Sequence, residues 1–226
     1  MRESNRITEL LSLGGCPVIS VVGAGGKTTI VKQLAAELGR AVITTTTHMF
    51  KEAALAASAD EAMSTDGIVW CGTDEGLKIS APPFLDELQN IPLVIEADGS
   101  KHKPFKIPAA HEPAVYKRST AVIGVLGLNA LGMSIRSAAF RPAGTASFLG
   151  TDEEHKLSIH DFCKVIVSEN GLRKNSRGEF FAVLTHADTP ELMDTARQIA
   201  ERCGSIRVYA MSAAEPIQNG GAEHGT

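Results

Sequence analysis

The sequence predicts an α/β fold, with a mainly parallel, doubly wound sheet in a three-layer sandwich. Short apolar segments rich in β-branched residues recur at 18–22, 40–45, 67–71, 92–96, 120–127, 180–185 and 206–210. Such runs are typical of strands buried on both faces, as in parallel sheets. Segments with helical patterns lie between them, at 28–38, 53–62, 83–89, 158–167 and 189–203. A glycine-rich turn joins the first strand to the first of these helices.

Local signals support the individual elements. The helix at 28–38 carries its apolar side chains on one face. Ser158 and Asp161 form the pattern of a capping box and predict a helix through residue 167. Thr189 fits an N-cap and Pro190 a first-turn position of the helix that ends near 203. A short amphipathic helix is predicted near the N-terminus, and the segment 128–150 reads as rich in loops.

The glycine-rich turn predicts a phosphate-binding loop of the P-loop NTPase type. Three glycines in four residues allow a tight turn whose backbone amides point inward and form a nest for anions. The helix that follows directs the positive end of its dipole at the same place. The lysine would supply a charge to the β- and γ-phosphates of ATP or GTP, and the first threonine a ligand to Mg²⁺. The predicted nucleotide-binding residues are Gly23, Ala24, Gly25, Gly26, Lys27, Thr28 and Thr29.

The spacing of this loop differs from the common pattern G-x-x-x-x-G-K-[ST]. Val21 stands where the first glycine of that pattern belongs, and the shorter form G-x-x-G-K-T-T resembles the loop of Mur-type ligases. A glycine-rich turn with a surface lysine is the alternative. The strand before the turn and the helix after it favour phosphate binding.

Length and charge limit the class of protein. With 226 residues and a net charge of −4, the chain is expected to form one domain over residues 1–214, followed by a disordered polar tail at 215–226. No apolar stretch of 18 residues occurs, and no basic face marks a nucleic-acid partner. Four widely separated cysteines without a C-x-x-C pair argue against a zinc site. We expect a cytoplasmic protein that binds neither membrane nor nucleic acid.

Two acids at the end of the strand 92–96 are the candidate catalytic and metal-binding groups. Glu96 and Asp98 are two positions apart, so both project to the side where the glycine loop opens. Two carboxylates beside phosphate suit one ligand to Mg²⁺ and one group that orients a nucleophile, and either residue fits either role. The alternative is a solvated pair of acids at a strand end.

Polar and basic side chains near the same edge are candidate substrate contacts. Thr46, Thr47 and His48 follow the strand 40–45, and ligands of doubly wound sheets bind at the carboxyl ends of strands. The preference of threonine for strands explains the run equally well. The proline-rich basic loop after the acid pair offers Lys101 and Lys106 to a second anionic substrate, or is an ordinary solvated loop.

Two further residues have candidate roles. Arg141 lies in a Phe-Arg-Pro step and is a candidate for stabilising transition-state charge on a phosphoryl group, although a surface role is more common. Asp188 ends a Thr-His-Ala-Asp step that is followed by Ser-Ala at 212–213. This arrangement resembles the base-reading corner of GTPases, in which Asn-Lys-x-Asp precedes Ser-Ala and the carboxylate accepts the ring N–H groups of guanine. A turn residue before a helix is the alternative.

The runs GAGGKTT, TTTTH and EADGSKHKPFKIPAAHEP together resemble the YqeC family, over about the first half of the chain. The resemblance implies a P-loop fold and the binding of ATP or GTP. It also implies an accessory role in the maturation of a selenium-dependent molybdenum hydroxylase, or in selenium cofactor biosynthesis. It implies no particular reaction.

Three functions follow as hypotheses. The first is a Mg²⁺-dependent NTPase or phosphotransferase that uses Lys27, Glu96, Asp98 and Arg141. The second is a carrier that holds a nucleotide-containing cofactor, such as a molybdopterin dinucleotide, without turnover; the acid pair favours turnover, because carboxylates repel a bound anion. The third is a relative of Mur-type amide ligases, which use additional domains that a chain of this length does not accommodate.

Overall fold

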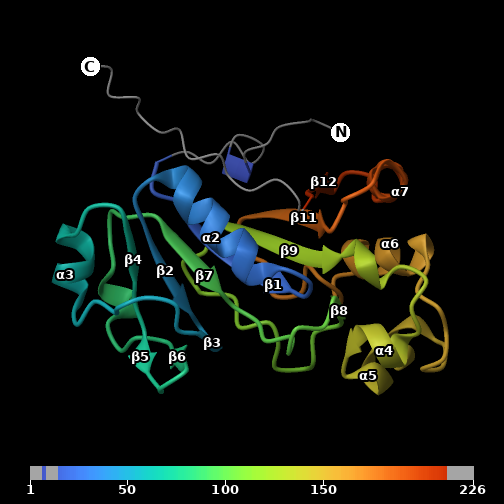
Figure 1. Ribbon diagram of the computed structural model, residues 1–226, viewed down its shortest axis with the longest axis horizontal. Helices are drawn as coiled ribbons and strands as arrows, with labels where there is room; N and C mark the ends of the chain where they lie inside the picture. Colours follow the sequence, from blue (N-terminus) through green and yellow to red (C-terminus); the bar gives the residue numbers. More distant parts are fainter. Residues whose placement is uncertain (1–6, 9–14, 213–226) are drawn as a thin grey trace, which may run out of the picture.

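A computed structural model describes residues 7–8 and 15–212. A seven-stranded sheet forms its middle layer, in the order β12-β11-β9-β1-β7-β2-β4 (Figure 1). Every neighbouring pair in this sheet is parallel, which confirms the predicted fold class. The strands are β1 (Val18–Gly23), β2 (Ala41–Thr45), β4 (Ile68–Trp70), β7 (Leu93–Glu96), β9 (Ala121–Gly127), β11 (Glu179–Thr185) and β12 (Arg207–Ala210).

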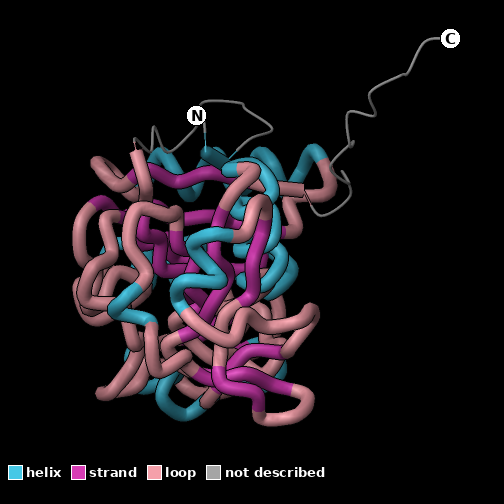
Figure 2. Tube along the Cα trace, turned by 90° about the vertical axis from the view of Figure 1, so that its left-hand side faces the viewer, coloured by secondary structure: helices cyan, strands magenta, loops and turns pink. Residues whose placement is uncertain are grey.

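Helices pack on both faces of the sheet. On one face α2 (Lys27–Leu38) buries Ile30, Val31 and Leu34 against side chains of β1, β2, β7 and β9. On the other face α6 (Ile159–Val167) and α7 (Pro190–Arg202) share a core with β9, β11 and β12. The short helix α3 (Ala59–Ser64) and the turn η1 (Leu85–Glu87) pack with β2 and β7. Figure 2 shows the strands of the main sheet at the centre of these layers.

Two small sheets lie beyond the carboxyl edge of the main sheet (Figure 1). One is antiparallel and consists of β3 (His48–Phe50), β6 (Lys78–Ser80) and β5 (Thr73–Asp74). The other pairs β8 (Phe105–Lys106) with β10 (Ala139–Phe140). The sequence did not predict either sheet, because strands of two or three residues carry almost no periodic signal.

Several helix predictions need correction. The alanine-rich helix expected at 53–62 begins only at Ala59, because Leu55 pairs with Trp70 and Ser58 caps the helix by accepting a hydrogen bond from the Glu61 amide. The helix expected at 83–89 is the single turn η1. The segment 128–150, expected to be loop, contains the turn η2 (Leu128–Ala130) and the helices α4 (Ile135–Ala138) and α5 (Pro142–Leu149).

Other local predictions are confirmed. Ser158 and Asp161 form the capping box of α6. The Thr189 hydroxyl caps α7 and Pro190 occupies its first turn. The predicted tail at 215–226 lies outside the described residues, as does almost all of the predicted N-terminal helix. No helix in the described part of the chain is long and apolar enough to span a bilayer.

Candidate nucleotide-binding site

The glycine-rich turn has a backbone shape that only glycine accommodates. Gly23, Gly25 and Gly26 have φ angles of 94°, 78° and 108°. A Cβ atom on Gly23 would lie 2.3 Å from the Val125 carbonyl oxygen, and one on Gly25 would lie 2.5 Å from the Gly127 nitrogen. Both contacts are with backbone, which has little freedom to move away. Side chains are therefore excluded by left-handed geometry and by close packing against the end of β9.

The amides at the end of this turn and at the start of α2 are free to bind an anion. The helix α2 begins after Gly26, and no side chain caps it. Within the described part of the chain, the amides of residues 25–29 donate no hydrogen bond to another protein group, and the Ile30 amide makes the first helical bond, of 3.0 Å, to the Gly26 carbonyl. The first turn of α2 also lacks acidic residues. Unpaired amides and the helix dipole converge here as they do in phosphate-binding sites.

Thr28 and Glu96 meet beside these amides. The Thr28 hydroxyl donates a 2.8 Å hydrogen bond to the Glu96 carboxylate. The register of β1 and β7 places Glu96 opposite Val21, two residues before the loop, and this explains how the strand end reaches the helix. Glu96 is buried, and burial raises the pKa of its carboxyl group.

The residues present fit a Mg²⁺ ion. Mg²⁺ is typically held by one or two carboxylates together with phosphate oxygens, rather than by a cage of protein ligands. A hydroxyl and a carboxylate in contact at the N-terminus of α2 supply such a partial set. No cluster of three or more His, Cys, Asp or Glu side chains suited to a metal occurs among residues 7–8 and 15–212.

Lys27 is the first residue of α2 and is buried, with 5 % of its surface exposed. Its ammonium donates a 3.0 Å hydrogen bond to the Ser100 hydroxyl. Burial lowers the pKa of Lys27, against the opposing effect of Glu96 and Asp98. Within the described residues, this neutral hydroxyl is the only hydrogen-bond partner of the ammonium, so the charge is available to an anionic ligand.

Asp98 differs from Glu96 because both of its oxygens are engaged. Oδ2 accepts a 3.2 Å hydrogen bond from the Gly23 amide, and Oδ1 forms an ion pair with the ammonium of Lys106. The Lys106 side chain is fully buried and also donates 2.6 Å to the Gly99 carbonyl. Burial raises the pKa of Asp98, and the Lys106 ammonium opposes that shift. The Asp98 carboxylate therefore ties the glycine turn to the loop that follows β7.

The ion pairs continue outward from Lys106. Its ammonium lies 2.9 Å from Glu112, which in turn forms two hydrogen bonds with the Arg141 guanidinium, at 2.5 and 3.0 Å. Burial raises the pKa of Glu112, but the hydrogen bonds from Arg141, the Ala109 amide and Lys106 together lower it to about 2. The sequence did not indicate a role for Glu112, although it is the central residue of the His-Glu-Pro step that ends the basic loop. Arg141, a predicted catalytic group, is held here by a carboxylate.

The predicted substrate contacts Thr46, Thr47 and His48 lie in two different places. Thr46 donates a 2.6 Å hydrogen bond to the Ala114 carbonyl, and the Thr47 amide bonds to Thr45 at 3.0 Å. The Thr46 amide also bonds to the Glu96 carbonyl at 3.3 Å, so this turn adjoins the acid pair. His48 belongs to the small antiparallel sheet, where its Nε2 lies 3.3 Å from Glu75.

Residues at the end of β11 also reach the glycine turn. The Thr185 hydroxyl donates a hydrogen bond to the Gly25 carbonyl. Asp188, the predicted base reader, accepts a 2.8 Å hydrogen bond from the Ser212 hydroxyl, so the two segments of the predicted corner meet. Ala213 lies outside the described residues.

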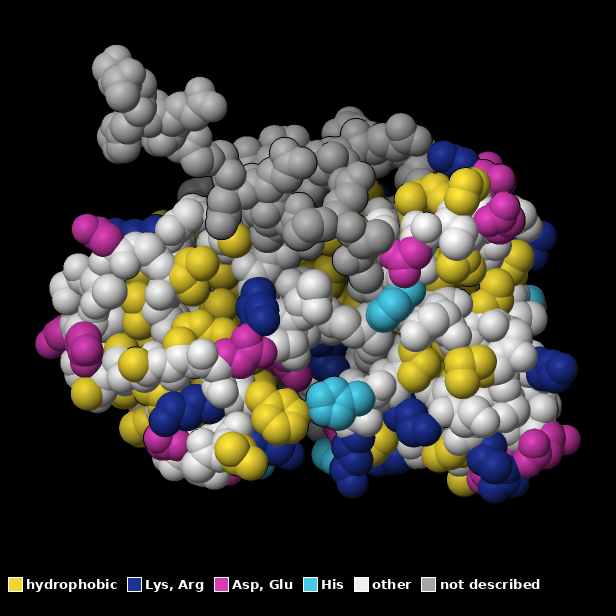
Figure 3. All heavy atoms as spheres, in the orientation of Figure 1, with side chains coloured by type: hydrophobic (Ala, Val, Ile, Leu, Met, Phe, Trp, Pro, Cys, Tyr) yellow, Lys and Arg dark blue, Asp and Glu magenta, His cyan; other side chains and the backbone are white. Residues whose placement is uncertain are grey.

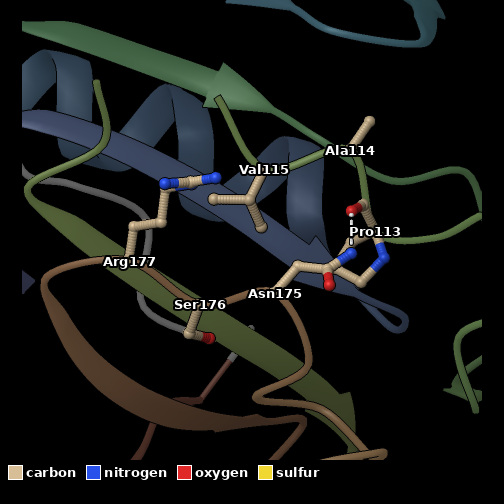
Figure 4. A pocket seen from close by; sticks show the side chains of 6 residues that line it. All are labelled: Pro113, Ala114, Val115, Asn175, Ser176 and Arg177. Atoms are coloured by element: carbon tan, nitrogen blue, oxygen red, sulfur yellow. Dashed lines mark hydrogen bonds between the residues drawn. The ribbon is translucent and has the colours of Figure 1, made fainter. Parts of the chain in front are cut away.

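A separate cavity of about 470 Å³ lies between the loops that precede β9 and β11 (Figure 4). The Asn175 amide donates a 3.1 Å hydrogen bond to the Pro113 carbonyl across it. Its lining includes no residue of the glycine turn or of the acid pair. The cavity is lined by Pro113, Ala114, Val115, Asn175, Ser176 and Arg177.

The fold and the site together define an α/β protein with a parallel seven-stranded sheet, whose glycine-rich turn and acid pair meet at the carboxyl edge. The chain belongs to the YqeC family: the sequence profile described as "YqeC protein" matches residues 19–143. It is 34 % identical over 183 residues to "Uncharacterized protein YqeC" of Escherichia coli K12, and the alignment covers 70 % of each chain. No solved structure matches it significantly.

Proposed function

We propose that this protein binds a Mg²⁺-nucleoside triphosphate on residues 23–29 and hydrolyses or transfers the γ-phosphoryl group. The observation that supports this most directly is the set of free amides at residues 25–29, next to the contact between Thr28 and Glu96. A turn whose only role is structural has no need of unpaired amides, a buried lysine and a buried carboxylate within one small volume.

The protein groups then have distinct roles. The free amides and Lys27 bind the phosphate oxygens. Thr28 and Glu96 would hold Mg²⁺, which neutralises charge on the β- and γ-phosphates when it is bound. Asp98 is the positioning group, because its oxygens already accept hydrogen bonds from the Gly23 amide and Lys106. The two acids, which the sequence left interchangeable, are thereby assigned different tasks.

The wider role that we propose is in the maturation of a selenium-dependent molybdenum hydroxylase or its cofactor. It is supported by the family resemblance of the segments that include the glycine turn and the loop after β7. The nucleotide chemistry is independent of this role and is tested separately.

Calorimetric titration with ATP and GTP, each with and without Mg²⁺, tests nucleotide binding. We expect Mg²⁺-dependent binding to the unmodified protein and a loss of at least about a hundredfold in Lys27→Ala, because a charge-assisted contact to phosphate is removed from a buried site. Lys32→Ala is the matched control: Lys32 lies on the same helix, is exposed, and pairs with Glu52 at 2.7 Å. Equal affinities of the two variants would refute the proposed site.

Measurement of phosphate release from the bound triphosphate distinguishes an enzyme that hydrolyses the nucleotide from a carrier that only binds it. We expect slow release by the unmodified protein and at least a tenfold reduction in Glu96→Gln, with nucleotide binding in the absence of Mg²⁺ retained. Tight binding without release, under conditions in which Mg²⁺ is bound, would instead favour the carrier of a nucleotide-containing cofactor.

A further inference from the structure

Backbone strain is concentrated around the candidate nucleotide site. Within the described residues, six non-glycine residues have a positive φ, and two of them are asparagines, which adopt this conformation readily. The other four all carry basic side chains. Lys and Arg are unfavourable in the left-handed region, and such strain is concentrated at functional sites. These residues are Lys101, His102, Arg141 and His186, with φ angles of 47°, 61°, 60° and 59°.

Each strained residue is linked to the candidate nucleotide site. Lys101 and His102 directly follow Ser100, the partner of Lys27. His186 follows Thr185, which bonds to the Gly25 carbonyl. The fourth, Arg141, is connected to Asp98 through the ion pairs of Glu112 and Lys106.

Three cations gather around one aromatic ring at this place. The Nζ atoms of Lys101 and Lys106 lie 6.0 and 5.1 Å from the centroid of the Phe140 ring, and the Arg141 guanidinium lies 4.6 Å from it. Lys106 and Arg141 have carboxylate partners, but Lys101 forms no ion pair within the part of the chain that the structure describes. The charge of Lys101 is therefore not neutralised by a described carboxylate and can attract an anion.

The molecule is hollowed on the face that Figure 3 shows. Figure 3 shows a hollow at the centre of this face, with Lys or Arg side chains at its floor and His side chains at its rim. The His102 ring, next to Lys101 in the chain, stacks on Phe50, with centroids 5.6 Å apart. Lys101 and Arg141 are both exposed, so a solute can reach them without any unfolding of the protein.

We propose that Lys101 and Arg141 bind the anionic group, a phosphate or a carboxylate, of a second substrate beside the nucleotide. This proposal rests on the proposed function, since it places the second substrate next to the triphosphate. It assigns Arg141 to that substrate. It also explains why a lysine is retained at position 101, although glycine or asparagine would adopt the same left-handed backbone with less strain.

The test uses inorganic phosphate and malonate as probes of the two anionic groups. Each is titrated calorimetrically, at constant ionic strength, into protein saturated with Mg²⁺ and the non-hydrolysable ATP analogue AMP-PNP. We expect one saturable site for one of the probes, and about tenfold weaker binding in Lys101→Gln and in Arg141→Gln, because each removes a charged hydrogen-bond donor. AMP-PNP affinity should stay within about twofold in both variants.

Lys103→Gln is the matched control, because it removes the same charge from the same loop. The Lys103 ammonium donates 2.8 Å to the Ser137 carbonyl and lies outside the cluster around Phe140. An equal loss of anion binding in Lys103→Gln, or no saturable site in nucleotide-bound protein, would overturn this proposal and leave the nucleotide site standing. If neither AMP-PNP nor its guanine counterpart GMP-PNP bound, the proposed function would be overturned. The same titrations without nucleotide would then decide the anion site by the same variants.

Discussion

Gly25 should be more sensitive to substitution than Gly39, a second glycine with positive φ at the opposite end of α2. Gly25 precedes α2 and Gly39 follows it, with φ angles of 78° and 73°. A Cβ atom on Gly39 would meet nothing within 4 Å. A Cβ atom on Gly25 would lie 2.5 Å from the nitrogen and 2.8 Å from the Cα of Gly127, and 2.9 Å from the Pro104 carbonyl oxygen. The two sites share backbone strain and differ in crowding.

The expected magnitudes follow from this difference. Alanine in the left-handed region costs about 1–2 kcal/mol at either position. Crowding against well-packed neighbours adds about 1–3 kcal/mol, which applies to Gly25 alone. For a chain of this size, each kcal/mol lowers the melting temperature by about 2–4 °C. Gly25→Ala should therefore melt at least about 2 °C and up to about 12 °C below Gly39→Ala.

Urea unfolding and thermal unfolding of the two variants measure the difference, and nucleotide titration shows where it acts. Gly25→Ala should also lose nucleotide affinity, since the turn that directs the amides of residues 25–29 must shift. Gly39→Ala should bind as the unmodified protein does. If the two variants were equally stable and bound nucleotide equally, the close approach of Gly25 to Gly127 would not constrain the loop as we argue.

Three further predictions concern charged groups. Burial raises the pKa of Glu96, and in the proposed site Mg²⁺ would bind the ionised carboxylate. Mg²⁺-dependent nucleotide affinity should therefore weaken as the pH falls, with a midpoint above the ordinary value of about 4.3. A flat profile from pH 7 to 4.5 would contradict this. Asp188→Asn should weaken GTP binding at least about tenfold and leave ATP binding unchanged, as competition experiments would show. The pKa of Glu112 is lowered to about 2 in the folded protein, so the ionised carboxylate stabilises the fold, and this contribution disappears as the pH falls from about 4.5 to 2. The difference in the free energy of unfolding between the unmodified protein and Glu112→Gln, measured in urea, should therefore shrink over that range. A constant difference would refute this prediction.

Much of the main sheet and part of the site could be predicted because their signals are local. The strand 120–127 is apolar throughout, and β9 occupies nearly the same residues. The contact between Thr28 and Glu96 follows from a glycine turn and a strand-end acid on neighbouring parallel strands. The capping box of Ser158 and Asp161 lies within four residues.

What could not be predicted depends on contacts between distant segments. Helix propensity at 53–58 is overridden by the pairing of Leu55 with Trp70. The ion pair of Asp98 with Lys106 forms across a loop that passes through Lys101, whose left-handed conformation no propensity favours. The bond between Glu112 and Arg141 spans 29 residues, so neither residue carried a local sign of the other.

The wholly parallel sheet has a consequence for how the protein acquires its site. Neighbouring strands of the main sheet are not joined by hairpins. The strand β1 lies between β7 and β9, which are distant in the sequence. For example, the Val18 amide donates a hydrogen bond to the Thr120 hydroxyl, 102 residues away. Closure of such long loops slows folding. During synthesis the glycine turn would emerge early. The strand β1 before it, however, can pair with β7 only after residue 96 has been made, and with β9 only after residue 125. Nucleotide binding by a growing chain should therefore appear late and abruptly, once β9 is available.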